Sequence, residues 1–133
     1  MTSGIRVLLI DDEKVFVDAL TNVLTRRGIR VQSAPDGYRA LQLVTDEEFD
    51  VLVLDLRMPG MDGLATLKAI RERDTLTPVI LLTGNIDLNQ VSDALKEGAA
   101  EVLLKPCPVE ILVSHIENAF ERKGFAAEVA RKI

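Results

Sequence analysis

VLVLDLRMPGMDG, residues 51–63, is a continuous apolar run that ends on a carboxylate and then on a Pro-Gly turn. The run is too short for a typical buried helix, and its branched side chains are typical of a strand buried on both faces of a sheet. Asp55 therefore follows the carboxyl end of a predicted strand, and in an open parallel sheet ligands bind at this edge. We interpret Asp55 as the reacting residue; the alternative is an Asp that merely begins a turn.

Similar runs recur along the chain, each followed by a helical pattern. Further strands are predicted at residues 5–10, 29–33, 78–82 and 101–104, of which the second alternates apolar and polar residues as an edge strand does. Apolar spacings of three and four residues predict helices at 14–27, 38–44, 63–73, 87–97 and 109–120. This alternation, with its short connections, predicts an α/β fold: a doubly wound, five-stranded parallel sheet with helices on both faces. The apolar stripe of the second helix is Tyr38, Leu41 and Val44, with Ala40 alongside, and that of the weaker fourth helix is Leu88, Val91, Ala94 and Leu95.

The composition is that of one soluble globular domain. The 133 residues suffice for a single core, and the apolar fraction of 47% and charged fraction of 28% are ordinary for such a domain. No apolar run approaches the roughly 18 residues that a membrane span needs, and the N-terminus lacks the pattern of a signal peptide, so we expect a cytoplasmic protein without a membrane partner. The net charge of −5 argues against direct nucleic acid binding, which needs a basic patch.

Two residue types that often carry chemistry occur once each. Cys107 is the single cysteine, so the chain has no internal disulfide, and we interpret it as an incidental small residue rather than a reactive thiol. The single histidine, His115, falls within the last predicted helix. We interpret it as a helix-face residue with little chemical role.

Polar residues follow four of the predicted strands. Because the carboxyl ends of parallel strands open on one side of a sheet, we expect Asp11, Asp12, Asp55, Thr83 and Lys105 to lie together. Three neighbouring carboxylates repel one another unless a cation lies among them. A site with oxygen ligands and room for water suits magnesium (Mg2+) better than zinc, which favours His or Cys.

A carboxylate beside a metal ion and a lysine can act as a nucleophile toward phosphorus and form an aspartyl-phosphate. In phosphoryl transfer the negative charge spreads over the equatorial oxygens, so the protein mainly supplies position and cations. Here Lys105 would pair with one phosphoryl oxygen, and Thr83 could donate a hydrogen bond to another. The sequence therefore predicts a phosphoryl-accepting site.

The chain resembles the receiver domains of bacterial two-component response regulators from Val7 to about Phe120. The residues that carry the resemblance are the pair Asp11-Asp12, the segment 55–63, Thr83-Gly84 and Lys105-Pro106. The resemblance implies that Asp55 is the phosphoacceptor, that Lys105 and Thr83 contact the phosphoryl group, and that the Lys105-Pro106 peptide bond is cis. The ligands that it implies for Mg2+, with Mn2+ as the alternative ion, are Asp12 and Asp55 directly, Asp11 through water, and the backbone carbonyl of Arg57.

The resemblance also implies a topology and partners. The family has the flavodoxin-like strand order 2-1-3-4-5. A sensor histidine kinase or a phosphotransfer protein would supply the phosphoryl group. The signal would pass to a downstream effector protein, to a C-terminal output domain outside this chain, or to a homodimer formed on phosphorylation. Such a domain is a phosphorelay switch rather than an enzyme, although it catalyses its own phosphorylation and dephosphorylation.

One position departs from the family pattern. Three residues before the lysine the family usually carries an aromatic residue, which turns inward when the threonine moves toward the phosphate; here that residue is Val102. Valine has no ring to turn. We therefore expect the output to run through the loop after the fourth strand and through the fourth helix, biased by the phosphate contact of Thr83.

Two other functions stay open. A metal-dependent phosphohydrolase on a similar sheet typically has a second Asp two residues after its nucleophile, but Arg57 stands there, so turnover would be slow. A pseudo-receiver that only binds partners is disfavoured by the intact acids and lysine.

We place the receiver domain at residues 1–124 and treat residues 125–133 as a C-terminal tail. In the tail, Phe125, Val129 and Ile133 recur every four residues among charged residues. This spacing predicts either a helical turn that packs on the domain or frays in solvent, or a helical extension or linker that leads toward a partner.

Overall fold

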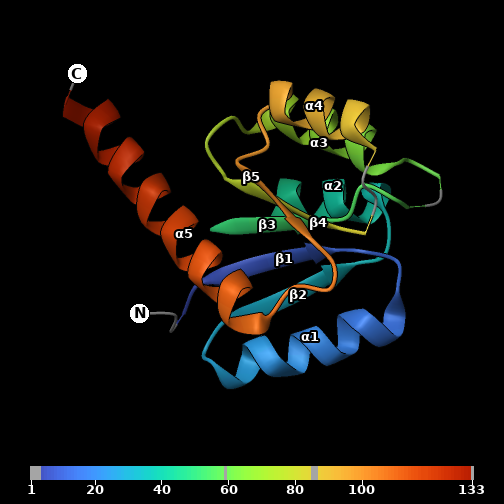
Figure 1. The fold of residues 1–133 in the computed structure, drawn as a ribbon. Coiled ribbons are helices and arrows are strands. Elements are labelled where there is room, and N and C mark those ends of the chain that lie inside the picture. The colour runs from blue at the N-terminus through green and yellow to red at the C-terminus, as the bar shows by residue number, and fades with distance from the viewer. Residues whose placement is uncertain (1–3, 59, 85–86, 133) are drawn as a thin grey trace.

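The computed structural model describes residues 4–58, 60–84 and 87–132, over which strands and helices alternate from end to end (Figure 1). The strands are β1 (Arg6–Ile10), β2 (Arg30–Ala34), β3 (Val51–Leu54), β4 (Val79–Thr83) and β5 (Glu101–Leu104). The helices are α1 (Lys14–Arg26), α2 (Gly37–Asp46), α3 (Gly63–Arg73), α4 (Leu88–Lys96) and α5 (Val109–Lys132). Outside the described residues lie residues 1–3 of the predicted domain, Pro59 of the predicted turn, residues 85–86 of the loop after the fourth predicted strand, and Ile133 of the tail.

The five strands form one sheet in the order β2-β1-β3-β4-β5, and every neighbouring pair is parallel. The sheet lies between two layers of helices: α1 and α5 cover one face, and α2, α3 and α4 cover the other (Figure 1). The predicted doubly wound fold and its strand order are confirmed. Among the described residues, the helices include none with the length and apolar character needed to cross a membrane.

The sheet separates two hydrophobic clusters, which explains why the central strands are apolar without interruption. In β3, Leu52 and Leu54 belong to the cluster under α2, α3 and α4, whereas Val51 and Val53 belong to the cluster under α1 and α5. Because successive side chains of a strand point to opposite faces, a strand covered on both sides needs an apolar residue at every position. All four residues of β3 are buried, so the strand that precedes Asp55 is held firmly within the core.

Three helices begin at an aspartate that caps their first turn. The side chains of Asp36, Asp62 and Asp87 accept hydrogen bonds from backbone N–H groups at the starts of α2, α3 and α4. Such caps satisfy backbone donors that have no partner within the helix. The N-cap residue of α1, Glu13, makes no such bond with its side chain.

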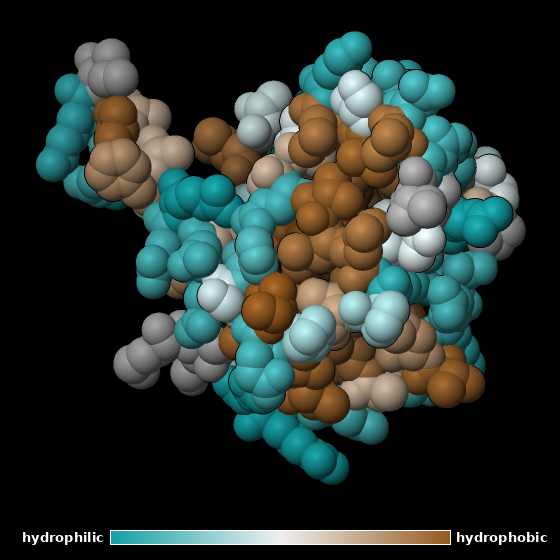
Figure 2. All heavy atoms as spheres, in the orientation of Figure 1, coloured by the Kyte–Doolittle hydropathy of each residue, from teal (hydrophilic) through white to brown (hydrophobic). Residues whose placement is uncertain are grey.

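The predicted apolar stripes of two helices are correct in most positions and wrong at Tyr38, Leu88 and Leu95. In α2, Ala40 is buried and Leu41 and Val44 pack on the core cluster, but Tyr38 is 62% exposed, and Gly37 and Leu43 are buried as well. A side chain at position 37 would meet the Thr66 hydroxyl of α3, so α2 approaches α3 too closely for a large residue on that side. In α4, Ala94 is buried and Val91 packs on the same cluster, as predicted, whereas Leu88 and Leu95 are exposed; hydrophobic residues gather at the surface over α4 and β5 (Figure 2).

The last helix continues through Gly124 without a break and extends away from the sheet (Figure 1). Phe125 is 73% exposed and Val129 41% exposed, so these side chains are not packed into the core of the domain. Further back along the helix, Lys123 donates hydrogen bonds to the Phe49 carbonyl and to the Thr77 hydroxyl at the opposite end of the sheet from Asp55. The division of the chain at residue 124 stays a prediction.

Two glycines provide a matched test of packing. A Cβ at Gly63 would lie 2.4 Å from the Asp55 carbonyl oxygen and 2.4 Å from the Leu56 Cα, whereas a Cβ at Gly124 would meet nothing within 4 Å. Gly63→Ala should lower the free energy of unfolding by about 1–3 kcal/mol because it overpacks a backbone contact. Gly124→Ala should raise it by about 0.5–1 kcal/mol because glycine is a poor residue for a helix interior. Urea denaturation of both variants checks the pair; equal effects would contradict the packing argument.

Candidate functional site

Asp11 and Asp55 extend two neighbouring strands by one residue each. The N–H of Asp11 donates to the Ala34 carbonyl at 3.0 Å, and the N–H of Asp55 donates to the Ile10 carbonyl at 3.0 Å. These ladder bonds fix both backbones at the carboxyl edge of the sheet. Asp11 is 3% exposed and Asp55 4% exposed, whereas Asp12 points to solvent. The edge therefore holds two buried acids and one exposed acid.

The carboxylates of Asp11, Asp12 and Asp55 each present an oxygen within 4.8 Å of the others. Burial raises the pKa of Asp11, outweighing the hydrogen bonds from Lys105 and from the Glu13 N–H, and the charge of Asp55 raises it further. Ionised acids at this spacing are costly without a cation. A cluster that offers only carboxylate oxygens fits a hard divalent ion such as Mg2+.

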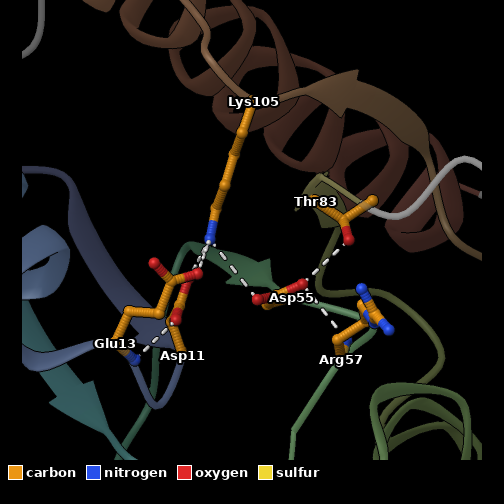
Figure 3. A network of polar contacts seen from close by, with 6 residues as sticks. All are labelled: Asp11, Glu13, Asp55, Arg57, Thr83 and Lys105. Carbon is orange, nitrogen blue, oxygen red and sulfur yellow. Dashed lines mark hydrogen bonds and ion pairs between the residues drawn. The ribbon is translucent and has the colours of Figure 1, made fainter.

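Lys105 contributes the positive charge of the site (Figure 3). Its Nζ donates to Asp11 Oδ2 at 2.8 Å, to Glu13 Oε1 at 3.1 Å and to Asp55 Oδ2 at 3.4 Å, and it lies 4.2 Å from the centre of the Phe16 ring. Burial alone would lower the pKa of Lys105, but the hydrogen bonds to Asp11 and Glu13 raise it above its usual value. The lysine therefore remains charged at neutral pH.

Two neutral donors fix the other oxygen of Asp55. The buried Thr83 hydroxyl donates to Asp55 Oδ1 at 2.8 Å, and the Arg57 N–H donates to the same atom at 3.1 Å (Figure 3). The Arg57 side chain is exposed and borders an open cleft of about 550 Å3, which also reaches Asp12. Asp55 thus lies at the edge of the sheet between a lysine and a threonine, and its neighbours Leu56 and Arg57 line the cleft.

The structure brings together all the predicted site side chains, Asp11, Asp12, Asp55, Thr83 and Lys105, from the ends of four strands. The Lys105-Pro106 peptide bond is cis, as the resemblance implied. The role of the Arg57 carbonyl as a metal ligand stays a prediction. By contrast, Glu13 and Phe16 also contact Lys105, although neither was predicted to belong to the site. The only signal for them was their position, directly after the acidic pair and in the first turn of the next helix.

The remaining residues singled out from the sequence lie elsewhere. His115 on α5 contacts the Glu101 carboxylate at the start of β5, and Glu101 also pairs with Arg122. This cluster is at the opposite end of β5 from Lys105. Val102 is half-buried beside Leu81 in the sheet and packs on the cluster under α2, α3 and α4.

The fold and the site define a class of protein: a doubly wound α/β domain with an acidic, lysine-containing site at the carboxyl edge of its sheet. The family model of the response regulator receiver domain matches residues 7–117. The chain therefore belongs to the family of response regulator receiver domains, which act as signalling switches. Receiver domains bind Mg2+ at an acidic pocket, and the aspartate cluster here fits such an ion.

Several known proteins are similar to this chain. The regulatory protein AtoC of Escherichia coli (strain K12) is 33% identical over 129 residues, which are 97% of this chain and 28% of that protein. The DNA-binding transcriptional regulator NtrC of Klebsiella pneumoniae is 36% identical over 111 residues, which are 84% of this chain and 24% of that protein. The structure of the Francisella response regulator 1452 receiver domain superposes with a TM-score of 0.82 at 31% identity, covering 90% of this chain and 98% of that one. The chain thus spans about a quarter of AtoC and NtrC but nearly all of an isolated receiver domain.

The raised pKa of Asp11 predicts a pH dependence of stability in the metal-free protein. The folded state binds this proton more tightly than the unfolded state, so the contribution of Asp11 to stability falls as the pH rises above the ordinary pKa of 3.8. Asp11→Asn cannot ionise. The free energy of unfolding of Asp11→Asn should therefore rise relative to that of wild type as the pH increases from about 4 toward about 7. Urea denaturation in the presence of a chelator measures this difference, and a gap that shrinks with rising pH would refute the assignment.

Proposed function

We propose that this chain is a phosphorylation-activated switch that accepts a phosphoryl group on Asp55. The observation that supports this proposal is the environment of one buried carboxylate: Lys105 contacts Asp55 Oδ2, while the Thr83 hydroxyl and the Arg57 N–H contact Oδ1. A nucleophile in phosphoryl transfer needs a fixed position and nearby groups that can stabilise negative charge. All three contacting groups are donors that could pass from the carboxylate to phosphoryl oxygens.

In the proposed reaction, one carboxylate oxygen of Asp55 forms a bond to phosphorus while the bond from phosphorus to the leaving group of the donor breaks. Lys105 then pairs with one phosphoryl oxygen and Thr83 donates to another. Asp12 and Asp55 would hold Mg2+ directly, with Asp11 through water and the Arg57 carbonyl as further ligands. The ion, or Mn2+ in its place, would neutralise the charge that gathers on the phosphoryl oxygens.

The output of the switch would begin at Thr83. This residue ends β4, and α4 follows it in the chain. Ala94 is buried in α4 and Val91 packs on the core cluster, so this helix has fewer buried residues than the other helices and is held less firmly. A new contact between Thr83 and a phosphoryl group would bias the loop after β4 and α4 between two arrangements. Val102 has no ring to report that change, so this route does not depend on an aromatic residue.

The partners are part of the same proposal. A sensor histidine kinase or a phosphotransfer protein in the cytoplasm would supply the phosphoryl group. The receiver would then act on a downstream effector protein, on an output domain attached to it, or on a second copy of itself. AtoC is named as a regulatory protein and NtrC as a DNA-binding transcriptional regulator. With a net charge of −5, this chain would leave any DNA contact to another domain or protein.

The first test is the intact mass of the protein after incubation with Mg2+ and acetyl phosphate. Wild type should gain one phosphoryl group, and the adduct should be absent from Asp55→Ala and from samples with a chelator. Asp46→Ala, which removes an exposed acid on α2, is the control and should be phosphorylated like wild type. A folded wild type without an adduct would refute the proposal and favour a binding-only domain. Rapid, repeated turnover of the donor would instead favour a phosphohydrolase.

A second test separates the Thr83 hydroxyl from the shape of the residue. Thr83→Val keeps the volume but removes the donor to Asp55, so we expect phosphorylation by acetyl phosphate to slow by roughly tenfold or more. The same change should lower the free energy of unfolding by about 1–3 kcal/mol, because a buried carboxylate loses a hydrogen bond. Thr83→Ser keeps the hydroxyl and should be phosphorylated nearly as fast as wild type. If the two variants react equally slowly, the hydroxyl is not the group that matters.

A further inference from the structure

Glu13 occupies the N-cap position of α1 but does not cap it. Its side chain makes no bond to the backbone of the helix, unlike Asp36, Asp62 and Asp87 at the starts of α2, α3 and α4. Instead, Glu13 Oε1 accepts a hydrogen bond from Lys105 Nζ at 3.1 Å (Figure 3). The Glu13 side chain thus pairs with a residue 92 positions away in sequence instead of with a backbone N–H of its own helix.

Lys105 lies closer to Asp11 and Glu13, which precede α1, than to Asp55. Its Nζ lies 2.8 Å from Asp11 Oδ2 and 3.1 Å from Glu13 Oε1, but 3.4 Å from Asp55 Oδ2. The ring of Phe16, three residues after Glu13, lies 4.2 Å from the same nitrogen. Residues three apart share one side of a helix, and an aromatic face attracts an ammonium group. Glu13 at the N-cap and Phe16 in the first turn of α1 therefore both contact the ammonium.

A bound cation would change the effective negative charge of Asp11 much more than that of Glu13. The Asp11 carboxylate belongs to the three-acid cluster that fits a divalent ion, and Glu13 is not a member of that cluster. An ion bound there would neutralise much of the charge with which Asp11 attracts Lys105. Glu13, with a side chain that is 62% exposed, would keep its charge and its contact. Glu13 is then the main anion that competes with an incoming phosphoryl group for Lys105.

We propose that Glu13, supported by Phe16, is a positioning residue that holds Lys105 in a resting position and so restrains phosphorylation of Asp55. The inference rests on the proposed function, because it concerns the lysine that would pair with the phosphoryl group. The contact with Glu13 must weaken before the ammonium can move toward a phosphoryl group on Asp55. The strength of this ion pair therefore sets part of the phosphorylation rate.

The test compares Glu13→Gln with Asp18→Asn. Glu13→Gln keeps the shape of the side chain and removes its charge; Asp18→Asn removes one charge from α1 at a residue that pairs with Lys14. Phosphorylation is followed by intact mass at saturating Mg2+ and constant ionic strength, with acetyl phosphate and with phosphoramidate. Glu13→Gln should be phosphorylated about two- to fivefold faster with both donors, the size expected of a partly exposed ion pair, and Asp18→Asn should match wild type.

A double-mutant cycle assigns the effect to Lys105. In a Lys105→Met background, Glu13→Gln should no longer accelerate phosphorylation, because the charge that Glu13 restrains is absent. A second readout needs neither donor nor metal. The ammonium 1H–15N signal of Lys105, identified by its loss in Lys105→Met, should shift in metal-free Glu13→Gln and stay in place in Asp18→Asn.

The outcomes separate this inference from the proposed function. If wild type is phosphorylated but Glu13→Gln reacts at the wild-type rate or more slowly, only the inference is overturned. An acceleration that persists without Lys105, or that Asp18→Asn reproduces, would assign the effect to overall charge and also overturn it. If wild type takes up no phosphoryl group from either donor, the proposed function fails and the inference fails with it.

Discussion

The structure depends on one electrostatic arrangement: a lysine ammonium placed among carboxylates at the edge of a buried sheet. Lys105 contacts Asp11 and Asp55, which are almost fully buried and lie at the ends of neighbouring strands. Buried charges are tolerated only when they are paired and hydrogen-bonded, and each group here is both. The single ammonium does not neutralise the site, because four carboxylates lie at this edge: those of Asp11, Asp12, Glu13 and Asp55. This edge of the sheet therefore has an excess of negative charge, which attracts a cation.

The rest of the fold serves to keep this arrangement in place. β1 and β3 are buried on both faces, and ladder hydrogen bonds continue past their last residues to Asp11 and Asp55. The neighbours of these acids differ in burial: Thr83 is buried at the end of β4, whereas the Glu13 side chain at the N-cap of α1 is 62% exposed. The acids are therefore held in place by the sheet, while an exposed group beside them is less constrained.

Helix orientation was harder to predict than helix position. The bounds of α3 and the extent of β3 follow from the sequence, because Asp62 caps the helix and the apolar run fixes the strand. The inward faces of α2 and α4 follow only in part: Ala40 and Ala94 are buried as predicted, but Tyr38 and Leu88 fit the same helical spacing and are exposed. The close approach of α2 to α3 selects small residues, and spacing along one helix contains no information about the neighbouring helix.

The sequence by itself determined the class of fold and which polar residues meet at one edge of the sheet. Apolar runs that end on acids, threonine and lysine imply parallel strands, and parallel strands bring their ends to one edge. Only the tertiary structure decided which oxygen each donor contacts, that Glu13 and Phe16 share Lys105 with the acids, and that α5 continues past Gly124. The physical reason is that side-chain partners far apart in sequence are chosen by distance and burial, which periodicity along the chain does not encode.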